Sequence, residues 1–394
     1  MNDRKTFALL TAARWAPIGL MTPISVLYMQ SRGLSLSTIG VVAIVYTLTV
    51  AALEIPTGSF ADAFGHRRIL VIGTGVSIAK FSLMFLANGA ALFIIASVLH
   101  GTERALRSGP LEAWYVARQP HDVRRGLSAG AIAEAVALAA GALLAGLLPL
   151  VFSGSAPLRV PIAAAVVLEV VHLGALFVLL PRATGSGAAP ARIAFTTVAH
   201  AGRDPHLRRL LLAPLTLGFA LYSVELLWQP RLATFVGTDD TVVFGVFATV
   251  AFACSALGAW LVVHASHRRD PAAAALVTML LYGATLVALA GASGVGMLAV
   301  AFGSGYFFVG AVGPLHGELL HHRVPDTARA TALSLVSMAG MTGLMVAALA
   351  LPPVAEHVST AAAWAISAVV IALGSLCYLA LREQTQVRRG GGTG

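Results

Sequence analysis

Long apolar runs separated by short polar segments are the main feature of the sequence. A helix needs about 20 predominantly apolar residues to cross the hydrocarbon core of a bilayer, and the runs have this length. A transmembrane β-barrel needs alternating apolar and polar residues, and the runs do not alternate. We therefore predict an all-α membrane protein with twelve transmembrane helices in two pseudo-symmetric six-helix bundles. The predicted spans are residues 7–30, 36–57, 69–88, 91–116, 127–152, 159–180, 207–234, 242–264, 272–290, 294–319, 329–351 and 359–381.

The segment 181–206 is the longest connection between predicted spans, and it is rich in Gly, Ala and Pro. This composition is typical of a passive linker. The linker divides the spans six and six, which is the plan of a transporter whose halves rock about a central site. We predict an N-terminal bundle at 1–180, a cytoplasmic linker at 181–206, a C-terminal bundle at 207–381 and a disordered cytoplasmic tail at 382–394.

Composition agrees with a membrane protein, because 58% of the 394 residues are hydrophobic and only 11% are charged. Soluble domains carry about 25% charged residues. The net charge of +9 is spread in short clusters between apolar runs, so we expect no nucleic-acid partner. Cys254 and Cys377 lie inside apolar runs, which argues against a disulfide framework or a cysteine metal site. We expect neither a metal nor a cofactor.

The distribution of Lys and Arg indicates the orientation of the chain, because cytoplasmic loops of membrane proteins are enriched in both. If the N-terminus is cytoplasmic, nearly all basic residues outside the spans fall on the cytoplasmic side. Only Arg32 and Arg159 fall on the opposite side. We predict a multi-pass protein of the cell (inner) membrane with both termini in the cytoplasm.

The loop after the second span, residues 58–70, reads Gly-Ser-Phe-Ala-Asp-Ala-Phe-Gly-His-Arg-Arg-Ile-Leu. It resembles the signature loop of the major facilitator superfamily, Gly-x-Leu-Ala-Asp-Arg-x-Gly-Arg-Lys-x-x-Leu, and it stands at the expected place in the topology. The departures are Ala63 at the usual Arg and His66 at a basic position. The resemblance implies a secondary transporter that works by alternating access.

Residues of this loop are candidates for a conformational latch. Glycine permits tight turns, and arginine offers charge-assisted hydrogen bonds to a carboxylate on another helix. Glu112, near the end of the fourth span, is our candidate partner. The resemblance implies that this network holds the two halves in an outward-facing state. The predicted latch residues are Gly58, Asp62, Gly65, Arg67, Arg68 and Glu112.

Ionisable residues inside the predicted spans are functional candidates, because a charge within the bilayer is costly. Glu103, Glu134 and Glu225 are the candidates for proton coupling. Structural alternatives remain for two of them. Glu103 stands four residues before Arg107 on one helix face, and Glu134 has Arg14 at a similar depth. Glu169 and His172 lie on the sixth span, where we favour a structural role.

The resemblance implies that spans 1, 4, 7 and 10 line a central cavity. An arginine of span 4 often takes part in proton coupling in the family, and Arg104 or Arg107 fits that pattern only in part. Gly109 and Pro110 predict a kink near the cytoplasmic end of this span. Trp15 has interface anchoring as an alternative role. The candidate cavity residues are Arg14, Trp15, Arg104, Arg107, Tyr222, Trp228 and Tyr306.

Few Asn or Gln residues occur in the spans, so the predicted cavity is mainly apolar and aromatic. We therefore expect proton-coupled efflux of a moderately hydrophobic small molecule, such as a drug or secondary metabolite, by a monomer. The Gly-Pro pattern that family exporters often carry in span 5 is degenerate here, so import of a sugar, organic acid or other nutrient by proton symport stays open. A remoter alternative is an intramembrane metal-dependent enzyme, from Glu318-x-x-His321. We expect no enzymatic activity.

Overall fold

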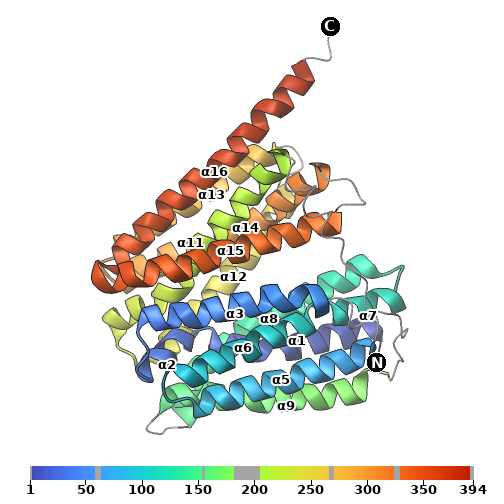
Figure 1. Cartoon of the computed structure of the whole chain (residues 1–394), viewed down its shortest axis with the longest axis vertical. Coiled ribbons are helices and arrows are strands. Elements are labelled where there is room, and N and C mark those ends of the chain that lie inside the picture. Colours follow the sequence, from blue (N-terminus) through green and yellow to red (C-terminus); the bar gives the residue numbers. More distant parts are fainter. Residues whose placement is uncertain are drawn as a thin grey trace. The chain divides into compact units, whose positions relative to one another are not determined.

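The computed structural model describes residues 2–57, 64–152, 156–181, 205–265, 270–323 and 329–390, and the regular structure in these ranges is helical (Figure 1). The predicted all-α class is confirmed. The helices are α1 (Asp3–Met21), α2 (Ser25–Ser31), α3 (Leu36–Thr57), α5 (His66–Leu86), α6 (Ala90–Arg107), α7 (Pro110–Arg118), α8 (Val123–Val151), η1 (Pro157–Arg159), α9 (Val160–Leu179), α11 (Pro205–Val236), α12 (Thr241–Ala265), α13 (Pro271–Ala290), α14 (Val295–Arg323), α15 (Arg329–His357) and α16 (Thr360–Gly390).

These helices correspond to the twelve predicted spans. Ten described helices are long and apolar enough to cross a bilayer, and α1 with α2 makes an eleventh if this bent pair is one span. Helix α6 is the twelfth, and hydropathy alone does not identify it because it carries Glu103, Arg104 and Arg107 in its last two turns. Its charges must therefore be accounted for by its neighbours.

Two predicted spans are broken where the sequence disrupts helical geometry. The first bends by 46° between α1 and α2, at Pro23, which lacks a backbone N–H and clashes with the preceding turn. The fourth ends at Arg107 and resumes as α7 at Pro110. Gly109 between them has φ 91°, a conformation that favours glycine. The predicted kink is confirmed as a full break between two helices.

The chain forms two compact units. The first comprises Met1–Ile193 with Val236–Val250, and the second comprises Ala194–Phe235 with Ala251–Gly394. Most of the predicted linker lies outside the described residues. Helix α16 continues to Gly390 and so extends into the segment predicted as a tail, 382–394. Residues 382–389 contain neither Gly nor Pro, so nothing in their sequence stops the helix.

Close backbone approach holds α1 against α8 in the first unit. A Cβ atom at Gly19 would lie 2.6 Å from the Leu138 carbonyl oxygen, and one at Gly141 would lie 2.6 Å from the Ala16 carbonyl oxygen. Lipid tails are as apolar as leucine, so association of helices in a membrane depends on this kind of tight packing. The same unit packs α6 against α3 and α5, and packs α9 against α1 and α5.

In the second unit, α13 packs against both α14 and α16 (Figure 1). Glycines also bring α11 and α15 together, because a side chain at Gly218 or Gly343 would overlap backbone of the opposite helix. Trp364 on α16 donates a hydrogen bond of 3.2 Å to the Ser223 carbonyl oxygen on α11. These contacts fix α11, the helix that carries Glu225, within its own unit.

The contact between α1 and α8 leads to a test of stability. We expect Gly141→Ala to lower the Tm of the purified protein, because the new methyl group would overlap backbone atoms of α1. Overpacking of this kind costs about 1–3 kcal/mol. The matched control is Gly75→Ala on α5, where a Cβ meets nothing within 4 Å. Equal Tm values for the two variants would contradict the inferred close approach.

Candidate functional site

A buried network of ionisable side chains connects α5, α6 and α9 in the first unit. Glu103 Oε2 lies 3.3 Å from Lys80 Nζ, and Glu103 Oε1 lies 3.0 Å from Arg107 Nη1. Arg107 Nη1 also contacts Glu169 Oε1 at 2.9 Å. These four side chains are at most 3% exposed. Two carboxylates thus meet two cations, so the network is balanced in charge when all four groups are ionised.

Ser77 and His172 complete the network around Glu169. Ser77 Oγ donates a hydrogen bond of 2.8 Å to Glu169 Oε1. His172 Nδ1 lies 3.2 Å from Arg107 Nη2 and 3.4 Å from Glu169 Oε2. Arg107 passes over Gly73, where a Cβ would come within 2.7 Å of the arginine Cγ. Gly73 therefore provides the space through which Arg107 reaches α9.

Some pairings of this network were predicted from the sequence and one was not. The pairing of Glu103 with Arg107 is present, as the structural alternative anticipated. Glu169 and His172, for which we favoured a structural role, both contact Arg107. Lys80 is the second partner of Glu103, and this pairing was not predicted from the sequence. The only signal for that pairing was a single Lys inside an apolar run, which had to meet an acid somewhere.

A second group of charges in the first unit is not paired. Arg104 is exposed, and Arg14 lies with its guanidinium 5.4 Å from the centre of the Trp15 ring. Glu134 on α8 is half-buried, and Arg14, Glu112 and Arg104 are its electrostatic neighbours. Within the described ranges, these four side chains form no ion pair with one another. The Arg14–Glu134 pairing considered from the sequence is thus not formed.

Glu225 on α11 is the principal ionisable side chain in the membrane part of the second unit. The Tyr306 hydroxyl on α14 donates a hydrogen bond to Glu225 Oε1. Tyr222 stands one turn before Glu225, and its buried hydroxyl has no hydrogen-bond partner in the described structure. Arg231 instead donates to the Ala292 carbonyl oxygen at 2.6 Å. No described cation pairs with Glu225.

Trp228 is a core residue of the second unit, although the sequence suggested a cavity residue. It is 1% exposed and packs on Phe302 with ring centroids 4.9 Å apart. Phe302 in turn meets Tyr306 edge to face. A large aromatic side chain on an amphipathic pattern fits a core and a cavity equally well, and only the tertiary contacts distinguish them.

The loop predicted as a latch is described only from residue 64 onward, so Gly58 and Asp62 lie outside the described residues. Gly65 has φ 90° and is the N-cap residue that precedes α5. Arg67 donates a hydrogen bond of 2.9 Å to the Phe177 carbonyl oxygen and lies 5.3 Å from the centre of that ring. Arg67 therefore binds the end of α9 and not the expected partner. Glu112 Oε2 is buried without a hydrogen bond among the described residues.

Side chains of the first unit also tie α1 to the segment around α7. Arg118 Nε and Gln119 Nε2 both donate to Asp3 Oδ2, at 3.1 Å and 2.9 Å. Arg4 lies 3.7 Å from Asp122, which also accepts from the Tyr115 hydroxyl. The sequence gives no local signal for the contacts of Asp3, because Arg118 and Gln119 lie 115 and 116 residues away along the chain.

Comparisons with known proteins agree with this architecture. The protein is 28% identical to the uncharacterized MFS-type transporter YxaM of Bacillus subtilis (strain 168) over 108 residues, which is 27% of each chain. Its fold resembles the nucleoside transporter NupG, with a TM-score of 0.81, 11% identity and coverage of 96% of this chain and 99% of that one. It also resembles a bacterial homologue of the human lysosomal transporter Spinster, with a TM-score of 0.76, 13% identity and coverage of 96% of both chains.

These similarities establish a multi-pass membrane protein with the fold of a transporter. The sequence model of the family described as Major Facilitator Superfamily matches residues 7–276, which is more than half of the chain. The resemblance suggested by the loop at residues 58–70 is confirmed by this match. The protein belongs to the major facilitator superfamily.

Proposed function

We propose that the protein is a secondary active transporter that works by alternating access and exports a moderately hydrophobic small molecule in exchange for protons. The observation that carries this proposal is Glu225, a membrane carboxyl that accepts a hydrogen bond from Tyr306 and has no cationic partner among the described residues. The proposal includes a monomer in the cell (inner) membrane with both termini in the cytoplasm.

Glu225 can bind or release a proton without breaking an ion pair. An ionised carboxylate in a low-dielectric site must be stabilised by neighbouring donors, whereas the protonated acid carries no charge that needs solvation. The ionised and protonated forms of Glu225 thus differ by one unit of charge, at a carboxyl held between α11 and α14. A conformational change that alters access of water to this carboxyl would couple proton movement to transport.

Glu103 has a different role in this proposal. Protonation of Glu103 would leave Lys80 and Arg107 with less compensating charge, and removal of one partner from a buried pair costs about 3–5 kcal/mol. We assign Glu103 to holding α5, α6 and α9 together. Glu134 is the second coupling candidate, because it is half-buried near Arg14 and Arg104 without an ion pair.

Substrate contacts would come from groups that have spare hydrogen-bonding or stacking capacity. In the second unit, the Tyr222 hydroxyl lacks a partner in the described structure. In the first unit, Arg14 with Trp15 offers a cation against an aromatic face, and Arg104 is a further exposed cation on α6. Each of these groups, taken in its own unit, suits a ligand with a large apolar body and few polar groups.

Import of a nutrient by proton symport is the alternative, and it would use the same carboxyl. The direction of ligand flux relative to proton flux distinguishes export from symport. A ligand is first identified by thermal shift of the purified protein against a panel of hydrophobic compounds, sugars, nucleosides and organic acids. Flux of that ligand is then measured in proteoliposomes with an imposed pH gradient. Movement of the ligand in the direction opposite to the flow of protons would support export. Movement of the ligand in the same direction as the protons would overturn export in favour of symport.

We expect Glu225→Gln to abolish flux driven by a pH gradient while ligand counterflow without a gradient continues. The amide mimics the protonated acid and cannot exchange a proton, so only the coupling is lost. The loss of driven flux should be at least about tenfold, as for removal of a required proton-transfer group. If the variant retained driven flux at the level of the unmodified protein, Glu225 would not be the coupling group.

A matched pair of tyrosine variants tests the same carboxyl. Tyr306→Phe removes the hydrogen bond to Glu225, so we expect it to shift the pH dependence of transport. Tyr282→Phe removes a buried hydroxyl that has no described hydrogen-bond partner, and we expect a smaller shift. Equal pH profiles for both variants would show that the hydrogen bond has no influence on coupling.

The buried network makes a separate prediction about stability. Lys80→Met and Glu103→Gln should each lower the Tm strongly, because each leaves a buried charge without its partner. The double variant should be less destabilised than the sum of the two, since Arg107 and Glu169 still balance each other. Additive losses would contradict the network. Loss of coupling in Glu103→Gln at an unchanged Tm would instead return Glu103 to the coupling candidates.

A further inference from the structure

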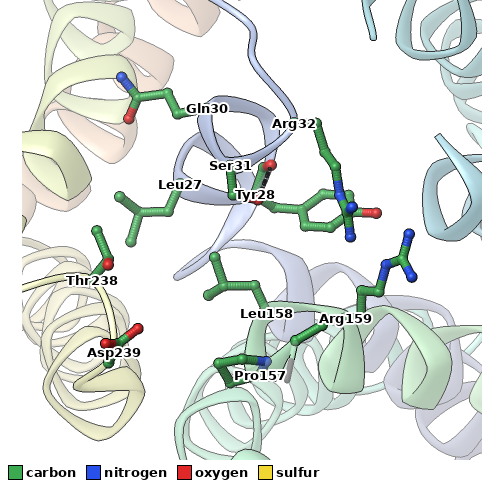
Figure 2. A pocket seen from close by; sticks show the side chains of 11 residues that line it. Leu27, Tyr28, Gln30, Ser31, Arg32, Pro157, Leu158, Arg159, Thr238 and Asp239 are labelled. Atoms are coloured by element: carbon green, nitrogen blue, oxygen red, sulfur yellow. Dashed lines mark hydrogen bonds between the residues drawn. The ribbon is translucent and has the colours of Figure 1, made fainter. Parts of the chain in front are cut away.

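A pocket of about 500 Å³ lies in the first unit where α2, the short helix η1 and the residues before α12 meet (Figure 2). Leu27 and Leu158 form an apolar part of its wall, and Arg32 and Arg159 form a cationic part. Figure 2 shows the two guanidinium groups on the same side of the pocket, with Asp239 on another side. The pocket is therefore amphipathic and has a concentrated positive charge.

Both arginines are held in place by the fold. Arg32 lies 5.2 Å from the centre of the Tyr28 ring, and its Nη1 donates to Asn88 Oδ1 at 3.4 Å. Arg159 lies 5.5 Å from the centre of the Phe85 ring. The Tyr28 hydroxyl donates to the Met84 carbonyl oxygen at 2.8 Å, which fixes α2 to the end of α5. Stacking orients each guanidinium plane but uses few of its N–H donors.

The hydrogen-bonding capacity of these arginines is largely unused. The Nε atoms of Arg32 and Arg159 are buried and have no hydrogen-bond partner in the described structure. Neither arginine forms an ion pair with a described acid. Two guanidinium groups on one pocket wall repel each other, so an anion between them would relieve both the repulsion and the unmet donors.

The positions of these arginines in the sequence point the same way. Arg32 lies between predicted spans and Arg159 is the first residue of one, and both depart from the charge pattern of the topology, which places most Lys and Arg at the opposite end of the spans. They are 127 positions apart by their numbers, yet both line one pocket. Arg32 and Arg159 thus depart from the distribution of basic residues and lie in the same pocket. An anionic ligand in this pocket would account for both positions.

We propose that this pocket binds a phosphate-bearing anion, with Arg32 and Arg159 as the binding pair. Guanidinium groups recognise phosphate oxygens through paired N–H donors. Two sources share this chemistry, the headgroup of an anionic phospholipid and a soluble phosphate ester. Leu27 and Leu158 favour the lipid, because its first acyl carbons would lie against them while Asp239 accepts from a headgroup hydroxyl.

The test measures binding of defined probes to the full-length protein in detergent, by native mass spectrometry and by Tm. One arm compares phosphatidylglycerol with a diacylglycerol of the same acyl chains, and the other compares glycerol 3-phosphate with glycerol. We expect phosphatidylglycerol to bind at least tenfold more tightly than the diacylglycerol. Tighter binding of glycerol 3-phosphate than glycerol, without any preference in the lipid arm, would assign the pocket to a soluble phosphate.

The variants Arg32→Gln and Arg159→Gln should each weaken phosphate binding about tenfold, which is the scale of one hydrogen bond to a charged group. The control is Arg124→Gln with Arg125→Gln, two exposed arginines elsewhere in the first unit, and it should leave binding unchanged. Unchanged binding in the Arg32 and Arg159 variants would overturn the proposal. If those variants do not fold, equal affinity of the unmodified protein for both members of each probe pair would overturn it as well.

Discussion

The cost of placing charge in a bilayer is the constraint on which the described structure depends. Water cannot solvate a side chain inside the hydrocarbon core, so a fully buried ionised group must be stabilised by nearby side chains. In the first unit Arg107 satisfies this requirement by contacting Glu103 on its own helix and Glu169 on α9. Lys80 brings α5 into the same network. Charge pairing thus selects which faces of three helices point toward one another.

The two units meet this constraint in different ways. In the first unit, the two acids of the buried network are matched by two bases, and Gly73 on α5 makes room for the Arg107 side chain. In the second unit, Glu225 relies on a tyrosine hydroxyl from α14. A paired carboxyl stabilises packing but is costly to protonate, whereas a carboxyl that has only neutral donors can change its charge with little rearrangement. The proposed division of labour, scaffold in one unit and coupling in the other, follows from this difference.

Much of the fold could be predicted because its signals are local. The thickness of a bilayer sets the length of apolar runs, and Pro23, Gly109 and Pro110 disrupt helix geometry by their own covalent structure. The candidate site was predicted less completely. Glu225 and Glu103 were identified as residue types out of place in lipid, but Trp228 proved to be a core residue and Arg67 binds the Phe177 carbonyl oxygen. Their neighbours come from distant segments, and no local pattern encodes them.

The sequence by itself determined the class, the spans and the family, since hydropathy, helix breakers and the loop at residues 58–70 each act over a few neighbouring residues. Tertiary structure alone decided which ionisable groups on different helices are partners. Arg107 and Glu169 are 62 residues apart, and Tyr306 and Glu225 are 81 apart. It also brought Arg32 and Arg159 to one pocket. Electrostatic interaction depends on distance in space, and helix packing sets that distance only once the chain has folded.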